Sequence, residues 1–183
     1  MAKMTLLPSG ESSVSSDWVI AGASPESTRW ESLDDDNGAT SYVSCNDSGA
    51  EMTIEFANPS VAEADIDFSV APSVRFVSSG RSDHRRFPSL VAISFEAPVG
   101  VSAYTESCSY DAHVSSFETI NGTARATSDG SAAWTYSDLE NLSMKCTKNG
   151  SIQVRLSYLA LEVTYTEAVA AVTDNATFFG ANF

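Results

Sequence analysis

The stretch WTYSDLENLSMKCTKNGSIQVRLSYLALEVTY, residues 134–165, decides the fold of this chain. From Ile152 to Tyr158, apolar and polar side chains alternate, which is the period of a half-buried β-strand. Beyond Tyr158 the apolar positions move by one residue, beginning at Leu159. Such a shift exchanges the two faces of a strand unless an extra residue absorbs it. The pattern therefore predicts a β-bulge near Tyr158–Leu159, with a strand buried on both faces as the alternative.

The rest of the chain offers partners for this strand. Short β-rich runs separated by turn residues occupy residues 40–45, 51–56, 64–70, 73–77, 90–95, 101–105 and 113–120. We expect Asn58-Pro59 and Pro72 to interrupt strands, because proline cannot donate to a sheet. One shared core is expected to contain Met52, Ile54, Phe56, Ile66, Phe68, Val70, Ile152, Val154 and Leu156.

No run of ten residues follows a helical period outside the C-terminal segment. The one helical turn expected is Ser137–Leu142, with Ser137 as the cap and Glu140 at capping-box spacing. Many short strands with a single helical turn indicate an all-β fold, an antiparallel β-sandwich of jelly-roll type. The chain divides into an N-terminal arm (1–16), the sandwich domain (17–167) and a C-terminal arm (168–183).

Composition limits the classes of function. The chain has 24 acidic and ten basic residues and a net charge of −14, which disfavours nucleic-acid binding. It lacks an apolar run long enough for a membrane span and a recognisable signal peptide. The three cysteines have no metal-binding spacing and are expected to be small buried residues: Cys45, Cys108 and Cys146.

No catalytic, cofactor or metal site is expected. The histidines His84 and His113 lie in no catalytic motif, and phosphate-binding glycine motifs are missing from the sequence. The run Asp34–Asp36 does not fit an EF-hand, because no glutamate closes the loop at position twelve. It is interpreted as a solvated turn, with an irregular Ca²⁺ loop as the alternative.

Two segments are candidates for contact with a partner. The first is the basic segment, residues 81–86, which together with Arg75 holds four of the ten basic residues and a histidine; its expected contact residues are Arg81, His84, Arg85 and Arg86. In so acidic a chain it predicts docking on an acidic neighbour, with a solvated loop as the alternative. The second is the C-terminal segment, residues 168–183, which has one charge and ends with Phe178, Phe179 and Phe183. Exposed phenylalanines are costly in water, so it should dock on another subunit or on its own domain.

The framework resembles β-sandwich structural proteins of tailed-bacteriophage virions. The similarity covers about residues 30–166 and rests on three features. These are the Asp-rich turn followed by Ser41-Tyr42-Val43, the Trp134-Thr135-x-x-Asp138-Leu139-x-x-Leu142 turn, and the strand Val154–Tyr165. The resemblance implies a virion component, such as a head-decorating (cement), head-fibre or tail-associated protein.

We therefore expect a non-enzymatic virion protein that decorates the capsid. Its partners would be the major capsid protein or tail proteins, and copies of itself in a small homo-oligomer such as a trimer. Neither nucleic acid nor a membrane is an expected partner. One alternative is a tail or fibre module that binds glycans by stacking on Trp18, Trp30, Trp134 or Tyr104. A hydrolase is the other alternative, and it would need a cleft with clustered polar groups.

Overall fold

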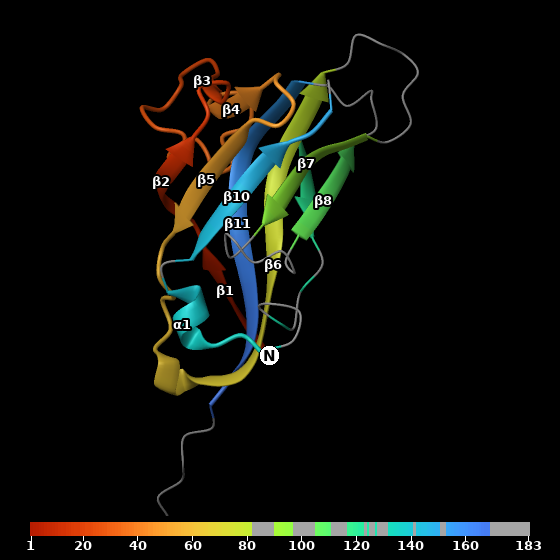
Figure 1. Cartoon of the computed structure of the whole chain (residues 1–183). Coiled ribbons are helices and arrows are strands. Elements are labelled where there is room, and N and C mark those ends of the chain that lie inside the picture. The colour runs from red at the N-terminus through yellow and green to blue at the C-terminus, as the bar shows by residue number, and fades with distance from the viewer. Residues whose placement is uncertain are drawn as a thin grey trace, which may run out of the picture.

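Two antiparallel sheets form the molecule, seen in a computed structural model in Figure 1. The structure describes residues 1–81, 90–96, 105–110, 117–122, 124, 127, 132–140, 142–150 and 153–168. Sheet A contains β1 (Ala2–Leu6), β3 (Val19–Ala21), β4 (Tyr42–Cys45), β6 (Ile66–Arg81), β9 (Glu118–Asn121) and β11 (Gln153–Glu167). Sheet B contains β2 (Pro8–Val14), β5 (Glu51–Phe56), β7 (Leu90–Glu96), β8 (Thr105–Tyr110) and β10 (Ser143–Lys148). The predicted all-β sandwich is confirmed.

The strand order is that of a jelly roll. Neighbouring strands in sheet A follow the order β4-β11-β6-β9, and those in sheet B the order β5-β10-β7-β8. From β4 to β11 the chain crosses from one sheet to the other at every connection except that between β7 and β8. Strands distant in sequence thus become neighbours, and β11 lies at the centre of sheet A. The fold places the longest strand pair, β6 with β11, along the full length of the sandwich.

A bulge in β11 lies at Ser157, one residue before the predicted position near Tyr158–Leu159. The pairing of β11 with β6 shifts register between Leu156 and Tyr158, so Ser157 is the additional residue. Before the bulge Val154 and Leu156 are buried, and after it the inward positions begin at Leu159. The bulge keeps the apolar side chains on both halves of the strand directed to one core.

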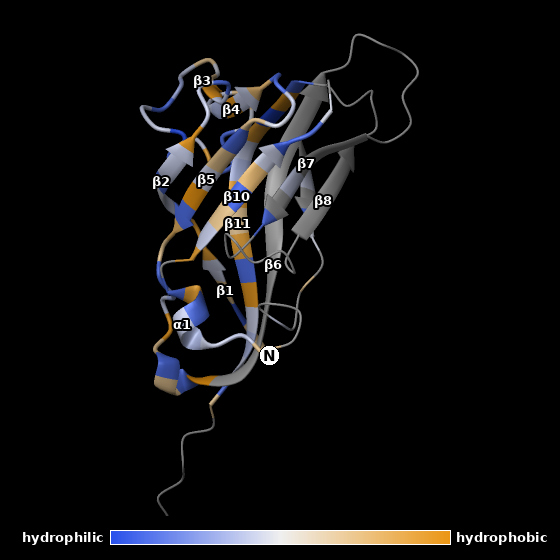
Figure 2. Ribbon diagram, viewed as in Figure 1, coloured by the Kyte–Doolittle hydropathy of each residue, from blue (hydrophilic) through white to orange (hydrophobic). Residues whose placement is uncertain are grey.

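The core fills the space between the sheets, and Figure 2 shows hydrophobic residues alternating with hydrophilic ones along β5, β10 and β11. Six of the nine expected core residues are buried: Met52, Ile54, Phe56, Ile66, Val154 and Leu156. The side chains of Phe68 and Val70 and the whole of Ile152 are outside the described set. Cys45 and Cys146 are buried, as small core residues would be, and the side chain of Cys108 is outside the described set.

The N-terminal segment differs from the expected arm. It is extended, but β1 pairs with β11 in sheet A and β2 pairs with β5 in sheet B. Met4 and Leu6 are buried in the core between the sheets. The sandwich thus begins at Ala2 rather than at residue 17. The sequence did not predict β2 because this strand has few apolar residues. It lies at the edge of sheet B and faces solvent.

Pro72 does not interrupt a strand, contrary to expectation. It lies within β6 and pairs with Val163 of β11. The other neighbour, β9, pairs only with residues 75–78 of β6, so at Pro72 the described sheet continues on one side only. Proline is tolerated at such an edge-like position, because a missing N–H on the open side breaks no ladder. The predicted end at Asn58-Pro59 does hold, since β5 stops at Phe56.

The single helical turn α1 (Tyr136–Leu139) begins earlier than expected. Its cap is Thr135, whose hydroxyl accepts from the Asp138 N–H while the Asp138 carboxylate accepts from the Thr135 N–H. This capping box replaces the predicted pair Ser137 and Glu140. A short 3₁₀ turn, η1 (Glu63–Asp65), precedes β6. Two later strands also differ from expectation. β8 occupies Thr105–Tyr110 rather than residues 101–105, and β9 occupies Glu118–Asn121 rather than residues 113–120.

Candidate functional site

The two predicted contact segments begin at opposite ends of one strand pair. Arg81 pairs with Gln153 at one end of the β6–β11 ladder, and Ile66 pairs with Glu167 at the other. Fifteen residue steps separate Ile66 from Arg81, so the two ends lie up to about 50 Å apart at a strand rise of about 3.3 Å. Figure 1 shows these ends of β6 and β11 at the top and the bottom of the molecule.

Of the predicted interface residues, Arg81 has a described backbone as the last residue of β6. The remaining predicted interface residues lie outside the described part of the chain: His84, Arg85, Arg86, Phe178, Phe179 and Phe183. The described residues nevertheless define the two places where these segments begin. Those two places, called the Arg81 end and the Glu167 end below, constitute the candidate site.

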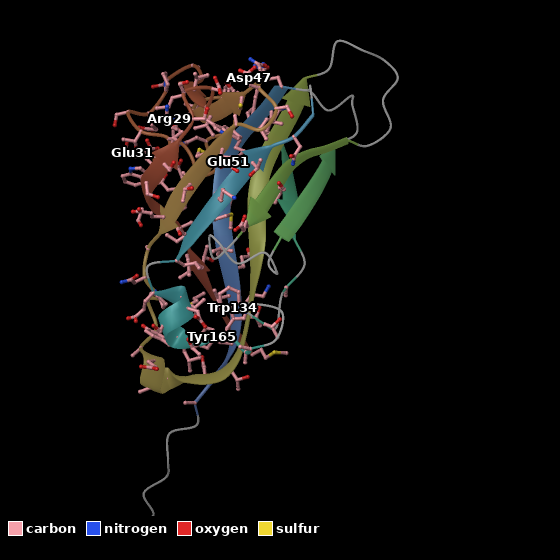
Figure 3. The ribbon with its side chains drawn as sticks, viewed as in Figure 1. Arg29, Glu31, Asp47, Glu51, Trp134 and Tyr165 are labelled. Atoms are coloured by element: carbon pink, nitrogen blue, oxygen red, sulfur yellow. The ribbon has the colours of Figure 1, made fainter. Side chains whose placement is uncertain are left out.

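A buried lysine holds the chain at the Arg81 end. Lys148 has no solvent-exposed surface, and its Nζ donates to the carbonyl oxygens of Asn149 (2.9 Å) and Gly150 (2.7 Å). Burial lowers the pKa of Lys148, and the neighbouring Cys45 and Asp47 oppose that shift. The ammonium group thus fixes the backbone at Asn149 and Gly150, shortly before Gln153, the residue paired with Arg81. Figure 3 shows Asp47 at this end of the sandwich.

An aromatic and cationic cluster lies on sheet A near the same end. The rings of Tyr42 and Phe117 have centroids 5.6 Å apart, and the Arg155 guanidinium lies 5.4 Å from the centroid of the Tyr42 ring. Arg155 also donates to Gln153 Oε1 through Nη2 (3.1 Å) and Nε. All four residues are half-buried. Half-exposed tyrosine and arginine are typical of protein interfaces.

Sequence reasoning did not single out this cluster. Arg155 is an outward position in the alternation of β11, and Tyr42 is an outward position beside buried Val43. That alternation could have identified each residue separately. The contact of Tyr42 with Phe117, however, joins residues 75 positions apart and depends on the tertiary fold.

The Glu167 end is closed by a backbone contact. The Ala168 N–H donates to the Asp65 carbonyl oxygen at 2.9 Å, which fixes the last described residue to η1. Beside it is an open hollow of about 300 Å³ lined by Met1, Ala2, Thr166 and Glu167. Trp134 and Tyr165 are buried towards this end of the sandwich, as Figure 3 shows. The C-terminal segment therefore starts from a well-defined position.

The acidic connection between β3 and β4 is internally satisfied. Glu31 Oε2 accepts hydrogen bonds from the hydroxyl groups of Ser27 (2.6 Å) and Thr28 (2.8 Å), which lower its pKa. The pKa of Asp34 is raised by burial and by the negative charge of Asp35. In the described residues, no group of three or more His, Cys, Asp or Glu side chains is arranged to hold a metal ion.

Two of the four aromatic residues proposed for glycan stacking are buried. Trp18 has no exposed surface and donates from Nε1 to the Ala50 carbonyl oxygen at 3.3 Å, and Trp134 is 2% exposed. Trp30 is half-buried against the core, and Tyr104 lies outside the described residues. Trp18 and Trp134 are therefore structural residues that offer no face to a sugar.

Comparison with known proteins supports the fold and no more. No protein-family model matches the chain, and no curated protein matches it. Among solved structures, the chain is similar to the crystal structure of the Agl-KA catalytic domain, with a TM-score of 0.50 and 11% sequence identity. The alignment covers 96% of this chain but 30% of that one, so the chain corresponds in length to less than a third of it. Within the described residues, no helix has the length and apolar character to cross a membrane.

Proposed function

We propose that this chain is a structural protein that acts by protein–protein contact at both ends of its sandwich. The observation that carries the proposal is that the basic and C-terminal segments begin at opposite ends of the β6–β11 pair, which are up to about 50 Å apart. Contacts at two distant ends allow one rigid domain to bridge two neighbours. The resemblance described above adds the finer proposal, a tailed-phage virion protein that decorates the capsid as a homo-oligomer.

The chemistry of the two ends suggests different partners. At the Arg81 end, arginines from the basic segment and the Tyr42–Arg155 pair would meet an acidic surface. At the Glu167 end, a segment with one charge and three phenylalanines would enter an apolar pocket of a neighbour. Since the chain carries a net charge of −14, a second copy can supply the acidic surface.

The perturbed titratable groups favour a structural role over catalysis. Lys148 is engaged by two backbone carbonyl groups, and Glu31 by two hydroxyl groups of its own loop. Lys145 lies between Glu51 (3.5 Å) and Glu96 (3.0 Å) on adjacent strands, and its hydrogen bond to Glu96 raises its pKa. Each shift has a local structural cause, so the proposal assigns no reaction to them.

The test is attachment of the protein to purified virions. Replacing Arg81, Arg85 and Arg86 with serine should release it at physiological salt, because the proposed contact is electrostatic. The matched control replaces the same three residues with lysine, which keeps the charge and should keep most of the attachment. Equal attachment of the serine variant and the parent contradicts docking by the basic segment. If the parent protein is missing from virions, its placement there is wrong.

A further inference from the structure

A polar hollow lies on the outer face of sheet B, where β2 pairs with β5 at the sheet edge. Its volume is about 440 Å³, and its lining consists of Ser9, Ser12, Glu55, Phe56, Ala57, Asn58 and Ser143. It is separate from the Arg81 end and from the Glu167 end. The contact function proposed above does not use it.

Two irregularities of one short strand build this hollow. Along β2, the pairing with β5 shifts register between Pro8 and Gly10 and again between Glu11 and Ser13. The additional residues are Ser9 and Ser12, and both line the hollow. Bulges at sheet edges commonly redirect side chains. Here two bulges within seven residues bring two hydroxyl-bearing residues to the same hollow.

A glycine between the bulges makes room for a carboxylate. Gly10 pairs with Glu55, and a Cβ atom on Gly10 would lie 2.8 Å from Glu55 Oε2. On the other side of β5, Ser143 of β10 is paired with Glu55. The Ser9 hydroxyl group donates to the Glu55 backbone oxygen at 3.5 Å. The carboxylate of Glu55 therefore lies over Gly10.

The lining chemistry selects the kind of ligand. Serine hydroxyl groups donate and accept, the Glu55 carboxylate accepts, and the Asn58 amide does both. None of the seven lining residues is basic, and Glu55 in a chain of net charge −14 would repel an anion. An apolar ligand would find little surface, because the one large apolar residue, Phe56, is 3% exposed. A neutral molecule with neighbouring hydroxyl groups satisfies these groups best.

We propose that this hollow is a binding site for a neutral saccharide, with Glu55 accepting hydrogen bonds from two sugar hydroxyl groups. Ser9, Ser12 and Asn58 would contact the same ring. Affinity should be weak, with a Kd of about 1 mM, because the hollow is open and its one aromatic residue, Phe56, is too deeply buried to stack on a sugar.

The experiment is an NMR titration of the full chain with four neutral disaccharides: maltose, cellobiose, lactose and diacetylchitobiose. At least one should shift the backbone amide signals of Ser9, Ser12 and Asn58 in the millimolar range. Glu55→Gln and Gly10→Ala should each weaken that binding by about tenfold. Glu51→Gln is the matched control, since it removes a glutamate from the same face of β5 outside the hollow and should bind as the parent does.

Thermal melts of the variants establish that each is folded. Two results would overturn the proposal. One is that none of the four sugars shifts these amides, and a shift caused by Ca²⁺ in that case would assign the hollow to a cation. The other is that Glu55→Gln and Gly10→Ala bind sugar as tightly as the parent.

Discussion

The backbone N–H of Leu159 donates a hydrogen bond to the carbonyl oxygen of Leu33 at 2.9 Å. This bond lies two residues after the bulge at Ser157, on the central strand of sheet A. On the same edge of β11, β4 pairs with residues 154–156 and β1 pairs with residues 161–165. Leu33, in the connection between β3 and β4, occupies the gap and buries its side chain completely. The connection therefore completes the sheet around the bulge.

Ser157 should not be needed for stability. Its Oγ is buried and has no hydrogen-bond partner in the described structure, so its hydroxyl group costs free energy. We expect Ser157→Ala to leave the free energy of unfolding unchanged or to raise it by about 1 kcal/mol. Urea unfolding measures this difference.

A second buried serine provides the control. Ser41 accepts from the Glu26 N–H (3.2 Å) and donates to the Ser32 hydroxyl group (3.0 Å). Ser41→Ala should therefore destabilise the protein by about 1–3 kcal/mol. If both alanine variants lost similar stability, Ser157 would have a partner that this account lacks.

Much of the fold follows from alternation in the sequence. The parity change in the long strand predicted the bulge, because a slipped register would have exposed Leu159 and its apolar neighbours. The same alternation in β10 places Met144, Cys146 and Lys148 inward, and it could have identified the buried lysine. A charged side chain at an inward position is an informative exception, because burying a charge requires compensating partners.

Other features could not be derived in this way. β2 carries few apolar residues, since it borders solvent and contributes mainly backbone hydrogen bonds to β5. Its two bulges, and the hollow they form, depend on pairing with a strand about 40 residues later. The Tyr42–Phe117 contact likewise depends on tertiary structure. Alternation in the sequence identified the strands and their buried faces. The candidate sites depend on which strands pair, and alternation does not reveal that.

Gly22 should be essential for the connection between β3 and β4. Its φ is +135°, and a Cβ atom there would lie 2.2 Å from the Thr40 carbonyl oxygen. Gly22→Ala should cost about 3 kcal/mol or more, from backbone strain and this clash. Gly38→Ala is the matched control, because Gly38 also has a positive φ (+56°) but a Cβ atom there would meet nothing within 4 Å. Gly38→Ala should cost about 1–2 kcal/mol. If urea unfolding showed the same loss of unfolding free energy for both variants, the clash at Gly22 would be refuted.

Asp34 should reduce stability at neutral pH. Its pKa in the folded chain is raised above 3.8 by burial and by Asp35, so the folded state disfavours its charged form. Asp34→Asn should raise the unfolding free energy at pH 7, by less than about 1 kcal/mol because solvent screens the charges. The gain should vanish below about pH 3.8, where Asp34 is protonated in both states.

Glu31 should behave in the opposite sense. Hydrogen bonds from Ser27 and Thr28 lower its pKa below 4.5, so its charged form is favoured in the folded state. The stability that the Glu31 carboxylate contributes is present above pH 4.5 and is lost as the pH falls through the folded-state pKa. Glu31→Gln should therefore destabilise the chain at pH 7. Thermal melts of both variants across pH 3–7 test the pair, and shifts of the same sign would be inconsistent with these assignments.

The most direct test of contact through the two ends is sedimentation equilibrium of the parent chain and a chain ending at Ala168. This truncation keeps the Ala168–Asp65 hydrogen bond and removes the three phenylalanines. We predict that the parent is an oligomer and that the truncated chain associates at least about tenfold more weakly, with the same melting temperature. A monomeric parent, unchanged association, or unfolding of the truncated chain would contradict the proposed role of the C-terminal segment.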